Sequence, residues 1–183
     1  MFSECISLEK IKFSTFNTEN VENMSYMFDK CKSLIILDLS SFNTKNVNDM
    51  SSMFNECNSL EEINLSSFNT SNVEFMSSMF NKCQSLKEIN LSSFNTSNVK
   101  DMSYMFNECK NLERIDISTF RYDNIQYLEY MFYLCKSLKE IDLSSFDNKN
   151  ANVTQIFSEC SSLKKINTKN SKILEEFERL KKK

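Results

Sequence analysis

The sequence predicts an α/β solenoid in which short parallel strands alternate with short helices, closed at its C-terminal end by a capping helix. The first observation is a fixed period: a cysteine, a leucine and a phenylalanine each recur every 26 residues through most of the chain. A period in this range indicates one structural unit that is copied and stacked. The second is a strand-like and a helix-like pattern inside each unit, and the third is a terminal amphipathic segment. The cysteines are Cys5, Cys31, Cys57, Cys83, Cys109, Cys135 and Cys160.

Each unit divides into two halves, for which residues 31–56 serve as the type case. Leu37 and Leu39 alternate with polar residues, as expected for a half-buried strand. Val47 and Phe54 belong to an apolar series that recurs every three or four residues, which is typical of one helical face. The unit is therefore expected to contain a strand followed by a helix of two to three turns.

The chain contains no glycine and no proline. Turns that require a positive φ angle therefore need another residue type, and Asn and Asp tolerate this region better than other residues. Because Asn recurs at equivalent positions of the units, we expect Asn and Asp to occupy the positive-φ positions.

Residues 1–166 are expected to form the solenoid, with about six units and a truncated first one, and 167–183 a capping helix with a basic tail. The cap is predicted by an apolar helical face that would cover the last unit; its members are Ile173, Leu174, Phe177 and Leu180. The N-terminal end begins in the middle of a unit and has no equivalent cap. Its apolar residues should be poorly covered, which leaves this end open to self-association.

Charges alternate between neighbouring units at equivalent positions. The residue before the cysteine is Glu4, then Lys30, then Glu56, then Lys82. Neighbouring strands of a sheet lie about 4.8 Å apart, which is close enough for such charges to pair. The alternation therefore predicts an in-register stack.

Composition excludes several functional classes. The formal net charge is −3, and basic residues gather only at the last three positions, which argues against a nucleic-acid partner. No apolar run approaches the length of a membrane span. The first residues do not have the pattern of a signal peptide.

The repeated segment L-x-x-L-x-L-x-x-F resembles the leucine-rich repeat, and the whole unit resembles the BspA-like branch of that superfamily. The motifs that carry the resemblance are L-S-S-F-N-T-S-N-V at 91–99 and M-S-S-M-F-N-K-C at 76–83. The resemblance covers residues 1–166. It implies a leucine-rich-repeat solenoid and a surface or secreted protein, although a cytoplasmic location stays open because no signal peptide is seen.

The regular cysteines could bind metal, form disulfides or act as small core residues. Metal binding is poorly supported, because the chain has no C-x-x-C motif and no histidine. The odd number of cysteines and their position on the apolar face favour seven buried free thiols. No metal and no cofactor is expected.

Two aspartates occupy neighbouring outward strand positions. Asp116 and Asp142 are one period apart, so their carboxylates are expected to face each other across adjacent strands. Such a pair could hold Ca²⁺ or act as an acid and a base. A solvated polar face that contacts a partner is the favoured interpretation, because no histidine or phosphate-binding loop accompanies the pair.

The fifth unit, residues 109–134, departs from the others where they agree. Tyr, Leu and Arg replace residues that are polar in most units, which indicates an interface. Drift, or contact with the C-terminal helix, is the alternative explanation. The candidate binding residues are Arg114, Asp116, Arg121, Tyr122, Tyr127, Tyr133, Leu134 and Asp142.

These observations favour a non-enzymatic module that binds a protein partner. The resemblance implies adhesion to a host protein at the cell surface. An intracellular interaction scaffold is the alternative, favoured by the free cysteines. An enzyme that uses surface carboxylates is a third and disfavoured possibility, since no nucleophile motif is recognisable.

Overall fold

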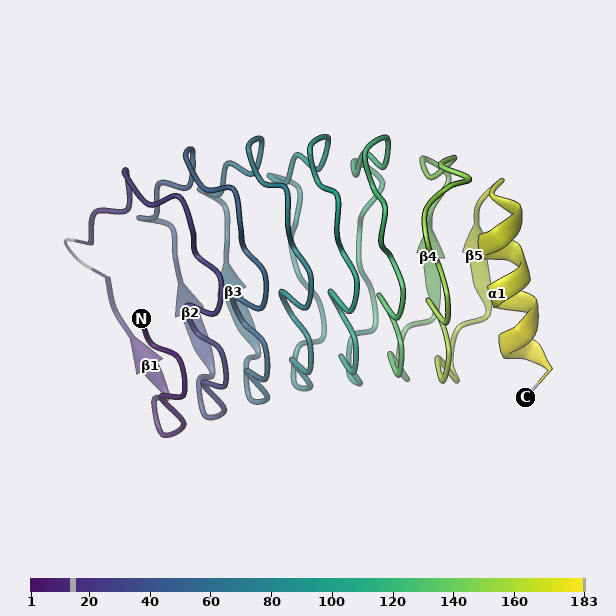
Figure 1. The fold of residues 1–183 in the computed structure, drawn as a ribbon. Helices are drawn as coiled ribbons and strands as arrows, with labels where there is room; N and C mark the ends of the chain where they lie inside the picture. Colours follow the sequence, from purple (N-terminus) through teal and green to yellow (C-terminus); the bar gives the residue numbers. More distant parts are fainter. Residues whose placement is uncertain (14–15, 183) are drawn as a thin grey trace.

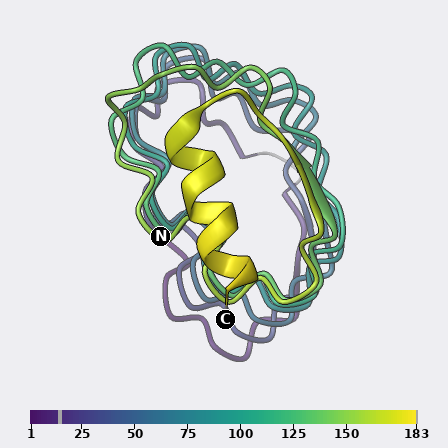
Figure 2. The same ribbon diagram turned by 90° about the vertical axis from the view of Figure 1, so that its right-hand side faces the viewer.

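The chain forms a row of stacked coils, as the computed structural model shows (Figure 1). It describes residues 1–13 and 16–182. Successive coils lie side by side, and the two termini lie at opposite ends of the row. Viewed along the row, the coils follow nearly the same closed outline (Figure 2). We number the repeats from each cysteine, so that repeat two is 31–56 and repeat five is 109–134.

Short parallel strands line one side of the row. A three-stranded parallel sheet and a two-stranded parallel sheet are present among the described residues. Residues one period apart pair with each other, for example Leu37 with Ile63. This in-register pairing confirms the predicted strands, whose bounds are β1 (Lys10–Ile11), β2 (Ile36–Asp38), β3 (Glu62–Asn64), β4 (Glu140–Asp142) and β5 (Lys165–Asn167).

The two sheets are separated by repeats four and five. The equivalent segments, residues 88–90 and 114–116, are not assigned to a strand. The inward side chains continue across this interval, because Ile89 is buried and Ile115 is half-buried against the core. The strand side is therefore continuous in packing but interrupted in backbone pairing.

The helix predicted for the second half of each repeat is wrong. This half is a series of turns, and it contains two residues with positive φ four positions apart, such as Ser52 and Glu56, both at 56°. An α-helix needs φ near −63° at every residue. The Ser52 N–H donates to the Ser77 carbonyl of the next repeat at 2.8 Å, and the Glu56 N–H donates to the Asn81 carbonyl at 2.8 Å. The apolar spacing of three and four residues thus fits two successive turns whose amides point along the row.

The residue types at these positions were also predicted wrongly. The positive-φ positions of the described chain carry Ser, Glu, Lys, Tyr, Leu and Gln, and not Asn or Asp. A left-handed conformation costs a non-glycine residue about 1–2 kcal/mol. The hydrogen bonds between repeats offset this cost. The asparagines act instead as local acceptors, as in Asn69, whose Oδ1 accepts the Ser71 N–H at 3.1 Å.

Stacked aromatic rings fill the core. One phenylalanine from each repeat lies on its equivalent in the next, with ring centroids 5.3 Å apart for Phe54 and Phe80 and 5.5 Å for Phe80 and Phe106. These rings are fully buried. Each repeat therefore has its apolar face covered only by its two neighbours.

The cysteines lie beside this ring stack. Six are buried, and each buried thiol donates a hydrogen bond to the carbonyl of a phenylalanine 28 or 29 residues earlier in the chain, as Cys57 does to Phe28 at 3.2 Å. Burial raises the pKa of Cys31 to about 11 and that of Cys109 to about 12. The expectation that all seven are buried is wrong for Cys5, which is exposed because it lies in the first repeat of the row.

The predicted alternation of charges is confirmed as ion pairs between repeats. Lys30 lies 2.9 Å from Glu4, and Lys82 lies 2.8 Å from Glu56. At a second repeat position, directly after the recurring leucine, Lys139 lies 3.1 Å from Glu113. These pairs are partly exposed, so they fix the register of the stack more than its stability.

The predicted capping helix is confirmed as α1 (Ser171–Lys181). The Asn170 side chain caps its first turn by accepting from the N–H groups of Lys172 and Ile173. Figure 2 shows α1 lying across the end of the row. Ile173 and Phe177 are buried there, whereas Leu174, predicted on the same face, is 43 % exposed. Among the described residues, no helix has the length and apolar character needed to cross a membrane.

Candidate protein-binding surfaces of repeat five

The predicted site residues of repeat five fall in two separate parts of its coil. Arg114 and Asp116 lie on the strand side. Tyr127, Tyr133 and Leu134 lie in the turn half of the repeat. The structure therefore divides the predicted site into two surfaces.

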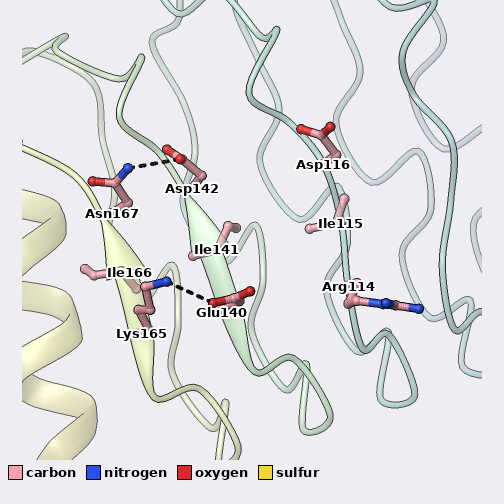
Figure 3. Close-up of a pocket in the computed structure, with 9 residues that line it drawn as sticks. All are labelled: Arg114, Ile115, Asp116, Glu140, Ile141, Asp142, Lys165, Ile166 and Asn167. Atoms are coloured by element: carbon pink, nitrogen blue, oxygen red, sulfur yellow. Dashed lines mark hydrogen bonds and ion pairs between the residues drawn. The ribbon is translucent and has the colours of Figure 1, made fainter.

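The strand side carries a shallow hollow at repeats five to seven (Figure 3). Arg114, Asp116 and Asp142, all predicted from the sequence, line it together. Its volume is about 460 Å³. The other lining residues are Ile115, Glu140, Ile141, Lys165, Ile166 and Asn167.

The polar groups of this hollow already have partners. Lys165 pairs with Glu140 at 3.2 Å, and Asn167 donates to Asp142 at 3.0 Å, as drawn in Figure 3. The Arg114 guanidinium lies 3.5 Å from Glu88 of the preceding repeat. A ligand would have to replace these interactions, which makes the hollow a solvated polar surface.

The two aspartates of the hollow are held in their ionised form. Hydrogen bonds from the side chain and N–H of Ser118 lower the pKa of Asp116, against a smaller opposing effect of the Asp142 charge. Ser144 lowers the pKa of Asp142 in the same way, with help from Asn167. A general acid needs a raised pKa, so this pair is poorly suited to acid–base catalysis. Within the described chain, no group of three or more His, Cys, Asp or Glu side chains could hold a metal ion.

The prediction that Tyr122 is a surface residue is wrong. Its side chain is 2 % exposed, and its ring packs at 5.2 Å, edge on, against Phe146. Tyr122 occupies the position of a buried threonine in the preceding repeats, where Thr70, for example, donates to the Asn95 carbonyl and accepts from the Asn95 N–H. Burial raises the pKa of the Tyr122 hydroxyl, which has no hydrogen-bond partner.

The remaining predicted residues lie at the surface to different degrees. Arg121 is exposed, and its N–H donates to the Thr96 hydroxyl at 2.7 Å. Tyr127 is 46 % exposed. Tyr133 and Leu134 are half-buried, and Leu134 has a positive φ of 59°.

Three tyrosines form a group in the turn half, and we call Tyr104, Tyr130 and Tyr133 the tyrosine cluster. The rings of Tyr104 and Tyr130 stack with centroids 4.9 Å apart and planes 8° apart. Tyr133 meets Tyr130 edge on at 5.7 Å. Sequence reasoning missed Tyr104 and Tyr130, although their spacing of one period in M-S-Y-M-F and L-E-Y-M-F is the signal that would have found them.

The cluster interrupts two polar rows that run through the earlier repeats. In one row, Asn107 donates to Asn81 at 2.6 Å and Asn81 donates to Asn55 at 2.7 Å; Tyr133 takes the next position. In the other row, serines occupy positions 51, 77 and 103, and Glu129 takes the next position. Repeat five thus replaces small, mutually bonded side chains with rings and a carboxylate.

Glu129 is the charged member of this region. Its Oε2 is buried and has no hydrogen-bond partner. The Tyr104 N–H donates to the Glu129 carbonyl at 3.0 Å, so the two residues are neighbours. In keeping with this, the Glu129 charge is the third cause, after burial and Tyr130, that raises the pKa of Tyr104. Tyr122 Oη and Glu129 Oε2 are the two buried side-chain polar atoms of the described chain that lack a partner, and both belong to repeat five.

Comparison with known proteins gives a family and no individual relative. Neither a curated protein nor a solved structure matches the chain. A family model described as "Mycoplasma protein of unknown function, DUF285" matches residues 1–90 and again residues 61–173. The two matches together span most of the sequence and overlap within the repeats. The chain therefore belongs to the DUF285 family.

Proposed function

We propose that the chain is a non-enzymatic protein-binding module of the leucine-rich-repeat type, similar to the BspA-like surface proteins, that attaches to a partner protein through repeat five. The proposal extends the family membership, since that family carries no assigned function. The contact surface is centred on the tyrosine cluster. The strand-side hollow with Arg114 and Asp116 is a secondary surface.

The observation that carries the proposal is the grouping of aromatic rings at the surface of repeat five and the adjoining part of repeat four. Tyr104 is 38 % exposed and Tyr130 and Tyr133 are half-buried, while the equivalent positions of repeats two and three carry serine or asparagine. Tyrosine is enriched in the residues that contribute most to protein–protein binding. Rings held together in this way supply contact area at a low cost in side-chain entropy.

The rest of the solenoid supports a binding role by its rigidity. A continuous core of stacked rings and hydrogen bonds between repeats fixes the turn half in place. A surface that is already ordered loses little conformational freedom when a partner docks. The inward Leu37 and Leu39 of the L-x-x-L-x-L segment support the leucine-rich-repeat type, with turns in place of helices.

A double substitution tests this function. Tyr130→Ser with Tyr133→Asn introduces the residues that repeats two and three carry at these positions, so the fold should be retained. The immobilised wild-type protein is expected to retain at least one protein from an extract of the organism or its host, and the double variant is expected to lose it. Tyr26→Ser, at the same repeat position but far from the cluster, is the matched control. Unchanged retention by a folded double variant would contradict the proposal.

An intracellular scaffold that uses the same surface is the second candidate. It is favoured by six free thiols held buried in the core, since exported proteins commonly convert cysteines to disulfides. Protease treatment of intact cells separates the two. Degradation of the protein supports surface attachment, whereas complete protection supports the scaffold.

A further inference from the structure

We propose that the tyrosine cluster and Glu129 together recognise an arginine side chain of the partner protein. This inference rests on the proposed function, because it names the chemistry of the contact that the cluster makes. It makes the cluster a site for a cation and not simply an apolar patch.

The first step is an open ring face. Tyr130 covers one face of the Tyr104 ring by stacking at 4.9 Å. On the other side, the equivalent residue of the preceding repeat is Ser78, whose side chain is too small to extend the stack. A planar guanidinium can take the place of a further ring, because the face of an aromatic ring attracts a cation.

The second step is an uncompensated charge. Other carboxylates of repeats four and five are paired, such as Glu108 with Lys110 at 3.4 Å and Glu113 with Lys139 at 3.1 Å. Glu129 has no ion pair within the described chain, and one of its oxygens is buried without a donor. A buried acceptor left without a donor loses the hydrogen bonds that it makes to water in the unfolded chain, which destabilises the fold. Glu129 as a whole is half-buried, so a small rotation of its carboxylate brings this oxygen to the surface, where the N–H donors of a cation remove the cost and an apolar partner would not.

The third step distinguishes arginine from lysine. The guanidinium group is planar, stacks on aromatic rings and presents several N–H donors in a fixed arrangement. It can therefore lie on Tyr104 and donate to Glu129 at the same time. A lysine ammonium is compact and strongly hydrated, so it satisfies the carboxylate without the stacking contact.

Nuclear magnetic resonance of ring-labelled tyrosine provides a direct test. The chain has six tyrosines and no tryptophan, so every ring signal can be assigned by single substitution. The probe is N-acetyl-arginine amide, and its neutral isostere N-acetyl-citrulline amide is the control ligand. Saturable shifts are expected at Tyr104, Tyr130 and Tyr133 with the arginine probe, and none at the isolated Tyr26.

Two substitutions test the role of the carboxylate. Glu129→Ser restores the serine of the preceding repeats and is expected to weaken binding of the arginine probe about fivefold or more. Glu61→Ser removes the same charge from the strand side and should leave binding unchanged. The buried Tyr122 signal reports in each spectrum whether the variant is folded, and Glu129→Gln replaces Glu129→Ser if the latter fails to fold.

The outcomes separate this inference from the proposed function. Equal shifts with both probes, or equal weakening by Glu61→Ser and Glu129→Ser, would overturn arginine recognition. If the tyrosine double variant loses the partner while Glu129→Ser keeps it, the binding function stands and the arginine site does not. If neither variant loses the partner, both fail.

Discussion

Repeats two to four and repeat five share a backbone and differ in how they treat their polar groups. In repeats two to four, buried threonines such as Thr70 bond to the backbone of the next coil, and the half-buried Asn55 and Asn81 bond to each other across coils. In repeat five, Tyr122 and Glu129 each leave a buried oxygen without a partner. Exposed or half-buried rings gather in the same repeat.

This difference shows how a repeat protein can place a binding site on a uniform frame. A consensus repeat satisfies its polar groups with its own neighbours, which leaves little for a partner to bind. Repeat five keeps the same turns and core but gives up part of this internal satisfaction. Unpaired buried polar groups are unusual in native proteins and call for a functional or structural reason.

Alkaline pH is expected to destabilise repeats two to four and repeat five together, because a buried cysteine lies in each of these repeats. Burial raises the pKa of Cys31 to about 11 and of Cys109 and Cys160 to about 12, whereas an unfolded thiol ionises near 8.5. Between these values the unfolded chain binds fewer protons than the folded one, so stability is fully present below about pH 8.5 and falls as pH rises. The loss should be about 1–2 kcal/mol per buried thiol at pH 10.

Urea unfolding at pH 8, 9 and 10 measures the slope with which the free energy of unfolding falls as pH rises. Cys109→Val should reduce it, and Cys5→Ser should leave it unchanged because Cys5 is exposed. An identical slope in the Cys109→Val variant would show that the buried thiols are not its source.

Removal of a core ring tests whether the consensus region is packed as tightly as the ring stack suggests. Phe68 in repeat three is 3 % exposed, and Phe68→Ala should cost roughly 3–5 kcal/mol through the cavity it leaves. Phe2 is only half-buried at the first coil, so Phe2→Ala should cost much less. Urea unfolding of both variants gives the comparison, and equal costs would contradict the difference in burial.

Removal of the buried Thr96 hydroxyl and removal of the buried Tyr122 hydroxyl should change stability in opposite directions. Thr96 donates to the Arg121 carbonyl and accepts the Arg121 N–H, so Thr96→Val should destabilise by about 1–2 kcal/mol. Tyr122→Phe removes a hydroxyl that has no partner and should stabilise by up to about 1 kcal/mol. Melting temperatures of the two variants decide the matter, and a loss of stability in Tyr122→Phe would mean that its hydroxyl is bonded in solution.

The ion pairs between repeats should have the smallest effect. Lys82 and Glu56 are partly exposed, so Lys82→Ala is expected to cost less than about 1 kcal/mol. The difference from wild type should shrink further at high salt. Unfolding measured at two salt concentrations checks this, and a large, salt-independent loss would assign Lys82 a packing role instead.

The strand side was predictable from the sequence because its signals are local. The alternation of Leu37 and Leu39 places one face inward whatever the rest of the chain does, and the period places equivalent residues in register. The strand-side residues Arg114, Asp116 and Asp142 therefore meet as predicted. The α1 helix was predictable for the same reason, through its apolar face.

The turn half was not predictable in this way, because its apolar spacing of three and four residues fits either a helix or two turns. The choice depends on where the backbone N–H groups find acceptors, and these lie one repeat away. Tyr122 was wrongly predicted at the surface for a similar reason. Whether its side chain points inward depends on the space between Phe120 and Phe146.

The sequence by itself determined the period, the register of the stack, the inward residues and the terminal cap. Only the tertiary structure decided the turn conformation, the burial of Tyr122 and the contact of Tyr104 with Tyr130. The physical reason is that these last features depend on contacts between residues about one period apart, whose geometry is set only when the coils are stacked.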